Sequence, residues 1–210
     1  MSVLVQSPAG HKSFSADPRF AAISETDVEA AIRTILSWIG EDPDREGLRE
    51  TPLRMVRAFA ECFSGYSEDP ALVLSKAFRE SEGVDEMIVL KRIPFQSHCE
   101  HHFAPIVGHA CVGYIPRRKI VGVSKLARVV EAYAKRLQLQ ERMTAQIANT
   151  IEAVLKPRGV GVVIKATHDC MNARGVRKKE GSVMTNHMLG AFRDIAVIRQ
   201  EFLSAVNACL

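Results

Sequence analysis

Two stretches near the start of the chain carry apolar residues at helical spacing. Ser24 opens a capping-box pattern, and apolar residues then recur three or four positions apart as far as Ile39, which predicts a first helix. Thr51 as cap and Pro52 in the first turn predict a second helix, which we expect to end at Gly65.

The pattern changes at Met87, where β-branched and apolar residues gather into short runs. Such runs are typical of strands. Helical spacing returns after Ser124, which we expect to cap a helix, and again after a break at residues 138–140. The predicted order is strands at 87–95, 105–116 and 119–123, helices at 124–137 and 141–155, a strand at 160–168 and a closing helix near 194–207.

This order predicts the organisation of the chain. Residues 1–22 mix Ser, Pro, Ala and Gly without periodicity, so we expect a flexible tail. Residues 23–85 form a helical segment, and residues 86–210 form the main domain. Because strands flank a pair of helices there, the sequence favours an α+β fold in which helices cover one face of an antiparallel sheet.

Composition narrows the class of protein. The chain has 210 residues, of which 47% are hydrophobic and 25% charged, as in ordinary globular proteins. No apolar run reaches the roughly 18 residues of a membrane span, and the first residues do not form a signal peptide. We therefore expect a cytoplasmic protein. The chain has five cysteines, and this odd number argues against a disulfide framework. Metal binding, catalysis and burial in the core remain as their possible roles.

Charge is distributed unevenly. Residues 1–100 carry 11 Lys and Arg against 17 Asp and Glu, whereas residues 101–210 carry 17 against 7. The second half therefore favours anions. Its cations are not interleaved with aromatic residues, so a phosphorylated small molecule fits at least as well as nucleic acid.

Cysteine and histidine are grouped at two places in the main domain. Cys99 and His102 stand three apart in a predicted link between strands, so a tight loop can aim both side chains at one ion. His168 and Cys170 follow far along the chain, and they share a face if the strand continues that far. Two thiolates and one imidazole would leave a coordination position for water, as catalytic zinc sites do.

Each of these residues also has a purely structural interpretation. An isolated Cys-x-x-His pair is weak evidence, but one Cys and two His beside Glu100, with a distant His-x-Cys, favour a metal site. The remaining cysteines have apolar neighbours and are predicted to be small core residues, namely Cys62, Cys111 and Cys209.

Two further groups could bind the parts of a nucleotide. Ser124, Lys125 and Arg128 fall in the first turns of a predicted helix, whose free N–H groups and positive dipole end favour phosphate. The carboxylate of Glu141, beside Gln140, could accept two parallel N–H bonds from a guanine edge. Each group alone has an ordinary alternative, as the solvated face or the acidic start of a helix.

Taken in order, the motifs resemble the GTP cyclohydrolase I family. They are CEHH, GYIP, VGVSKLARVV, LQLQERMTAQIA, HDC and ARGV, and they span the chain from near Thr51 to its C-terminal RQEFL. The resemblance implies the tunnelling fold, in which sheets of neighbouring subunits join in a ring, commonly as a homodecamer of two pentamers. It also implies that GTP is converted to 7,8-dihydroneopterin triphosphate and formate, the first step of folate or tetrahydropterin biosynthesis.

The resemblance also implies roles for particular residues. Zn²⁺ would be held by Cys99, His102 and Cys170, and protons would be exchanged by His101 and His168. Glu141, helped by Gln140, would bind guanine. The triphosphate would contact Ser124, Lys125, Arg128 and Arg174, with Arg54 and Arg57 contributed by a neighbouring subunit. GTP would be the substrate, and neither nucleic acid nor a membrane would be a partner.

Two other functions remain open from the sequence. A noncatalytic, zinc-stabilised module that binds nucleotides through its basic half would hold zinc with four protein ligands. An interaction protein could also keep the fold after losing turnover, although the presence of both His101 and His168 argues against this.

Overall fold

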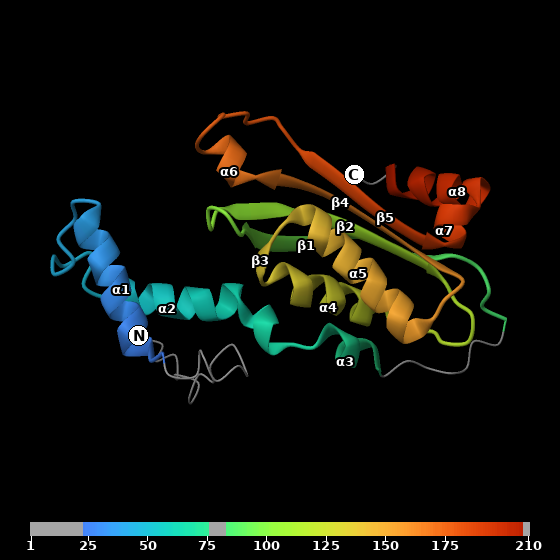
Figure 1. Ribbon diagram of the computed structural model, residues 1–210, viewed down its shortest axis with the longest axis horizontal. Helices are drawn as coiled ribbons and strands as arrows, with labels where there is room; N and C mark the ends of the chain where they lie inside the picture. Colours follow the sequence, from blue (N-terminus) through green and yellow to red (C-terminus); the bar gives the residue numbers. More distant parts are fainter. Residues whose placement is uncertain (1–22, 76–82, 208–210) are drawn as a thin grey trace, which may run out of the picture. The chain divides into compact units, whose positions relative to one another are not determined.

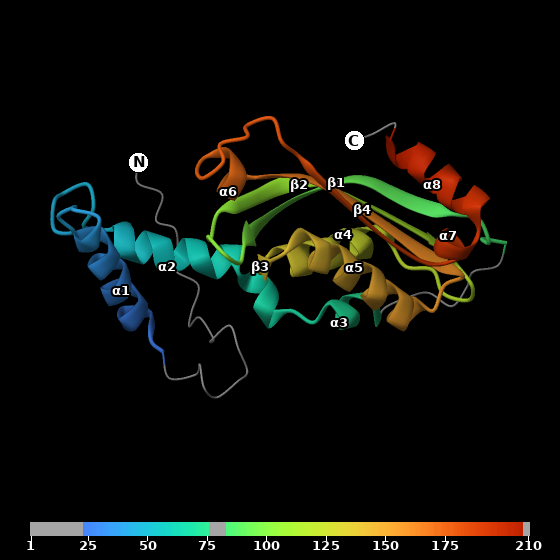
Figure 2. The same cartoon turned by 45° about the horizontal axis from the view of Figure 1, so that its top comes forward.

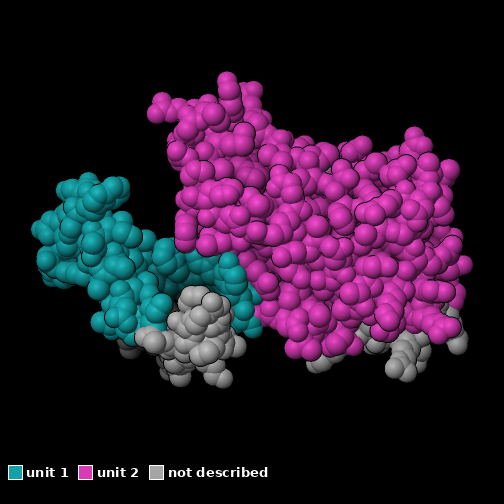
Figure 3. Space-filling model, in the orientation of Figure 1, with its two compact units in different colours: residues 1–67 teal, residues 68–210 magenta. Residues whose placement is uncertain are grey.

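The computed structural model describes residues 23–75 and 83–207, which divide into two compact units, residues 1–67 and 68–210 (Figure 3). The predicted tail at 1–22 and the predicted core residue Cys209 lie outside the described residues. The domain boundary predicted at 85/86 differs from this division because α3 (Pro70–Ser75) packs against helices of the second unit. Within the described ranges, no helix combines the length and apolarity that a bilayer crossing requires.

The first unit is a pair of packed helices. α1 (Glu25–Trp38) starts with the predicted capping box, in which the Asp27 N–H donates to Ser24 Oγ at 3.2 Å and the Ser24 N–H donates to the Asp27 carboxylate at 2.9 Å. α2 (Thr51–Cys62) has Glu50 rather than Thr51 at its cap and ends before the 3₁₀ turn η1 (Ser64–Ser67). The two helices pack through Ile32, Leu36 and Val56.

The second unit contains a five-stranded sheet in the order β3-β1-β2-β4-β5 (Figure 1). Its long strands, β1 (Ile88–Cys99), β2 (Pro105–Ile115), β4 (Gly159–His168) and β5 (Val183–Gly190), pair antiparallel, and the short β3 (Leu137–Gln138) pairs parallel with β1. The helices are α4 (Val123–Ala134), α5 (Gln140–Leu155), α6 (Asp169–Asn172), α7 (Ala191–Asp194) and α8 (Ala196–Asn207).

The two faces of this sheet are covered differently. α4 and α5 lie along one face and bury Leu126, Met143 and Ile147 against the strands, whereas α8 covers part of the opposite face (Figures 1 and 2). The α+β class and the predicted tunnelling-fold arrangement, an antiparallel sheet with two helices on one face after an N-terminal helical segment, are therefore confirmed. α4 leads through β3 to the end of the sheet where Cys99 lies, and α5 starts from that end, which decides the position of the site residues.

Several local predictions differ from the structure. Residues 119–122 form a connecting loop rather than a strand, and Val123 already belongs to α4. The cap of α4 is Gly122, so Ser124 lies within the first turn and does not cap the helix by its side chain. The sequence does not predict β5, because it is an edge strand in which three consecutive polar residues, Thr185, Asn186 and His187, interrupt the apolar pattern.

Two paired glycines make room for the helices on the second face. Gly113 of β2 lies opposite Gly161 of β4, and Phe192 and Phe202 pack over this pair. The two rings meet edge to face, with their centroids 5.1 Å apart. A Cβ added at Gly161 would lie 2.6 Å from Phe192 and 2.7 Å from Phe202. The absence of side chains at this pair of positions therefore lets α7 and α8 dock.

We expect Gly161→Ala to destabilise the protein, because an added methyl group must displace two packed rings. Overpacking of this kind costs about 1–3 kcal/mol in the free energy of unfolding. Chemical denaturation followed by circular dichroism measures the change. Gly122→Ala is the control, since a Cβ there meets nothing within 4 Å. Equal stability of the two variants would contradict this account of the packing.

Candidate metal centre

Cys99 is positioned by the end of β1 and by a tight turn. Burial alternates along β1, so Phe95, Ser97 and Cys99 all face the helices, and Cys99 is only 5% exposed. The Cys99 N–H donates to the Ala104 carbonyl at 2.8 Å, and the Cys99 carbonyl accepts the N–H of His102 at 3.3 Å. The turn therefore brings the imidazole of His102 back towards the thiol, with Nδ1 3.8 Å from Cys99 Sγ.

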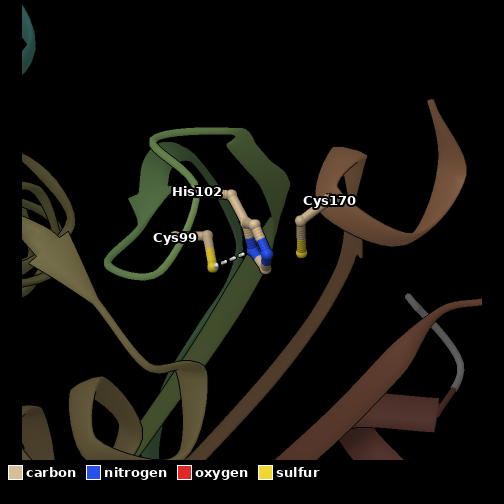
Figure 4. Close-up of side chains that lie close together, drawn as sticks. All are labelled: Cys99, His102 and Cys170. Carbon is tan, nitrogen blue, oxygen red and sulfur yellow. Dashed lines mark hydrogen bonds between the residues drawn. The ribbon is translucent and has the colours of Figure 1, made fainter. Parts of the chain in front are cut away.

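Cys170 reaches the same place from the other end of the chain. β4 ends at His168, which pairs with Ile106 of β2, so the turns that follow β1 and β4 lie at the same end of the sheet. Cys170 belongs to the helical turn α6 and not to the strand, so the two-residue period does not position it. The sulfur and nitrogen atoms of Cys99, His102 and Cys170 all lie within 4.8 Å of one another (Figure 4).

The donor set fits zinc. A tetrahedral ion with Zn–S bonds of about 2.3 Å and Zn–N bonds of about 2.1 Å separates its ligand atoms by roughly 3.6–3.8 Å. The 3.8 Å between Cys99 Sγ and His102 Nδ1 matches this spacing. The Cys170 sulfur lies within 4.8 Å of both atoms, so only a small movement of its side chain is needed to complete the site. Among the described residues the group has three donors, as in open zinc sites, and His102 lies at the surface.

Burial and neighbouring charges shift the pKa values of two groups at this site, the Cys170 thiol and the His168 imidazole. Burial raises the pKa of the Cys170 thiol, and its hydrogen bond with Cys99 adds to the rise, because a thiolate there would face a second sulfur. Arg174 opposes this shift through its charge, so its guanidinium lies near enough to act on Cys170. Burial also lowers the pKa of His168, and the nearby Glu141 carboxylate offsets part of that change.

His101 differs from the half-buried His168 in lying at the surface. His101 is 61% exposed, and its Nδ1 lies 3.9 Å from Cys99 Sγ. Its Nε2 lies 3.8 Å from the Glu100 carboxylate, which also pairs with Arg142 of α5. Arg142 could not be predicted as a partner of this loop, because nothing in the sequence indicates that α5 begins beside it.

Gln140 and Glu141 begin α5 directly beside the metal group. Glu141 is exposed and close enough to affect the pKa of His168, so its carboxylate is free to meet a ligand. Gln140 is only 1% exposed, and its side chain lies 2.8 Å from His168 Nε2. The predicted role of both residues was guanine binding. In the structure Glu141 presents an exposed carboxylate, whereas the amide of Gln140 is buried.

The predicted phosphate seat lies at the other end of α4. The helix has 12 residues and so a length of about 18 Å. Its C-terminal end leads into β3, which pairs with Cys99, whereas Ser124, Lys125 and Arg128 fall in its first two turns. Ser124 and Lys125 therefore stand nearly a helix length from the end of α4 that leads to the metal group, and Arg128 about half a helix length. Arg174, one residue beyond the cap of α6, is the member of the predicted set that lies near Cys170.

Arg54 and Arg57 belong to the first unit. Both are exposed on α2, and Arg54 donates to the Glu50 carboxylate at 2.6 Å, one turn earlier in the chain. An exposed pair of this kind contributes little to stability and can release the guanidinium to another anion.

Comparisons with known proteins agree with the motifs. The sequence profile of the family described as GTP cyclohydrolase I matches residues 28–207. A protein named GTP cyclohydrolase 1 from Pelagibacter ubique is 50% identical over 88% of this chain and 92% of its own length. A protein of the same name from Brucella abortus is 50% identical over 87% and 86%. The crystal structure of the archaeosine synthase QueF-Like in the apo form, at 20% identity, covers 50% of this chain and 93% of that one with a TM-score of 0.41, too distant to support a functional conclusion.

Proposed function

The chain belongs to the GTP cyclohydrolase I family, and we propose that it converts GTP to 7,8-dihydroneopterin triphosphate and formate at a zinc site formed by Cys99, His102 and Cys170. The family predicted from the motifs is thereby confirmed. The observation that carries the proposal is the convergence of two thiols and one imidazole, from opposite ends of the domain, beside the start of α5.

The metal group and its neighbours suit attack on an aromatic ring. Carbon 8 of guanine is a poor electrophile, so its hydrolysis needs an activated water and a proton for the adjacent ring nitrogen. Zinc bound by three protein ligands lowers the pKa of water towards neutrality. His168, after taking up a second proton on Nδ1, is the proposed proton donor to the purine. His101, in the same turn as Cys99, is the proposed partner for the later proton transfers.

Recognition of the purine is assigned to Glu141. Its exposed carboxylate stands in the first turn of α5, one residue from the buried contact with His168. A carboxylate can accept the ring N–H and the amino N–H of guanine together, and neither oxygen is committed to a hydrogen bond with another described residue. The guanine would then lie with its imidazole half towards the metal group.

Binding of the triphosphate is assigned to residues from more than one subunit. Ser124 and Lys125 stand nearly a helix length from the end of α4 that leads to the metal group, and Arg128 about half that length. We therefore infer that a neighbouring copy supplies them. Arg174 would join them from the chain that holds the metal, and Arg54 and Arg57 would come from a neighbouring subunit. A closed homo-oligomer, proposed as a decamer of two pentamers, supplies such shared sites. The cytoplasmic location stays a prediction.

Incubation of the zinc-loaded protein with GTP tests the proposal directly. We expect stoichiometric release of formate and, after oxidation, a fluorescent pterin product. Protein that is fully loaded with zinc and correctly assembled, yet releases no formate, would disprove the proposed activity. Zinc retained without turnover, with coordination closed by a fourth protein ligand, would instead support a noncatalytic zinc-stabilised module.

If the site is shared between subunits, two defective variants should restore low-KM activity when they assemble into the same oligomer. Replacing both Lys125 and Arg128 with alanine should raise the KM for GTP by about 10- to 100-fold per residue, because each loses a hydrogen bond to a charged group. Cys170→Ser should be inactive by itself. Co-expression of the two in equal amounts should return low-KM activity at about a quarter of the sites, since a site can then combine intact halves from neighbouring chains.

Lys135→Ala is the matched control for this experiment, because Lys135 follows the last turn of the same helix and pairs with Glu131 at 3.0 Å. Its KM should stay unchanged. Mixed oligomers without any recovered activity would show that the seat and the metal group act within one chain, contrary to the proposal.

A further inference from the structure

A buried amide beside the metal group has a role that differs from substrate binding. We propose that Gln140 is a positioning residue, which holds the ring of His168 in place and keeps its hydrogen on Nε2, so that Nδ1 is the ring atom available to the substrate. This inference rests on the proposed function, in which His168 exchanges a proton with the purine.

The orientation of the Gln140 amide is set by what surrounds its nitrogen. Gln140 Nε2 donates to the carbonyl oxygens of Val183 at 3.0 Å and Ile164 at 3.2 Å, which belong to two neighbouring strands. Carbonyl oxygens can only accept hydrogen bonds. Turning the amide over would place Oε1 against both of them in a buried site, which is strongly unfavourable. Oε1 must therefore be the atom that faces His168.

This orientation decides which nitrogen of His168 carries a hydrogen. The Gln140 Oε1 atom lies 2.8 Å from His168 Nε2 and can only accept. The imidazole must therefore donate through Nε2, and in its neutral form the lone pair then belongs to Nδ1. Because a hydrogen bond of this length also fixes the plane of the ring, the amide both orients His168 and selects its tautomer.

Two threonines complete the network, Thr144, which is buried, and Thr185, which is half-buried. Gln140 Nε2 also lies 3.1 Å from Thr185 Oγ1, and Thr144 Oγ1 donates to the Gln140 backbone carbonyl at 2.7 Å. Since the hydroxyl hydrogen of Thr144 is used in that bond, Thr185 must donate across the 2.7 Å between the two hydroxyls. The amide nitrogen of Gln140 has two hydrogens for these three acceptors, so one N–H is shared between two of them. The network joins α5 to β4 and β5.

The same contacts argue against a direct role for Gln140 in binding guanine. Its side chain is 1% exposed, and its nitrogen faces three acceptors within the protein. A substrate could be contacted by this amide only after these bonds were broken. Recognition of the guanine edge is therefore left to Glu141.

The kinetic test compares Gln140→Leu with Thr185→Val in the zinc-loaded oligomer. Gln140→Leu should lower kcat by about 10- to 100-fold with little change in the KM for GTP, because a positioned acid or base contributes 10²- to 10⁴-fold and a loose ring loses part of that. Thr185→Val is the matched control, since it belongs to the same network without touching His168. In Thr185→Val the two carbonyls still orient the amide of Gln140. The kcat of this variant should therefore fall no more than about fivefold, which corresponds to the loss of one neutral hydrogen bond.

The tautomer is read directly by nitrogen NMR of the zinc-loaded protein labelled with ¹⁵N-histidine. The seven histidines give a resolved set of signals, and the His168 signal is identified by its loss in His168→Asn. We expect the Nε2–H form of His168 in the wild-type protein and in Thr185→Val, and a mixture of forms in Gln140→Leu. Zinc content and oligomeric state should be equal in all of them.

The outcomes separate this inference from the proposed function. An Nδ1–H tautomer in the wild-type protein overturns the inference, even if Gln140→Leu fails to fold or to keep zinc. A raised KM with unchanged kcat and tautomer in Gln140→Leu also overturns it and makes Gln140 a substrate contact. A wild-type protein that releases no formate would disprove the activity, whereas the NMR result would still decide whether Gln140 orients His168.

Discussion

Cys170→Ser is expected to lose both metal and turnover. A serine hydroxyl does not replace a thiolate on zinc, and even partners outside the coordination shell change metal affinity by about 10- to 100-fold, so a lost ligand should cost more. Formate release should fall by at least about 10³-fold, because water activation depends on the bound cation. Metal content by atomic absorption and formate release by enzymatic assay measure the two effects.

Cys62→Ser controls for the substitution itself, because Cys62 is a half-buried thiol outside the metal group. It should keep its zinc and its activity. Cys99→Ser should behave like Cys170→Ser, since both sulfurs belong to the same set of donors. If Cys170→Ser remained fully active in the presence of a chelator, the assignment of the metal ligands would be wrong.

Glu141→Gln is expected to remove most of the discrimination for guanine. The variant keeps one acceptor oxygen but presents an amide nitrogen to a donor on the base, so the bidentate arrangement is lost. A site that binds substrate N–H groups in this way loses several powers of ten when the match is broken. We expect kcat/KM for GTP to fall by about 10²- to 10³-fold, measured by initial rates of formate release.

Inosine triphosphate, which lacks the amino group of guanine, separates recognition from general damage. The wild-type protein should strongly prefer GTP, whereas Glu141→Gln should treat the two nucleotides more equally. Glu131→Gln is the control, because Glu131 is an exposed glutamate on α4 whose partner is Lys135. An unchanged preference for GTP in Glu141→Gln would assign guanine recognition to other residues.

The general fold could be predicted because its core follows simple periodicities. The helical spacing that ends at Leu155 corresponds to α5, whose apolar side packs on the sheet. The apolar run at 160–168 corresponds to β4, an inner strand with buried side chains on both faces. β5 could not be predicted in the same way, because its side chains are set by the neighbours they meet. Thr185, for example, is explained by the Gln140 amide rather than by strand propensity.

The candidate site could be predicted in part. The spacing of Cys99 and His102 implies a common ion, and the turn that joins them satisfies this locally. The approach of Cys170 could not be inferred from strand period, since the strand ends two residues earlier and α6 turns the side chain. It depends on the pairing of β4 with β2, which is a long-range contact.

The sequence by itself determined which chemical groups this protein can use: the thiols, the imidazoles, the carboxylate beside the start of a helix and the cationic second half. Residue type and short spacing are sufficient for that, because they act within one turn or one strand. Only the tertiary structure decided that the first turns of α4 stand a helix length from the metal group, and that Gln140 faces His168. Those relations depend on where helices and strands begin in space, which is fixed by packing across the whole sheet.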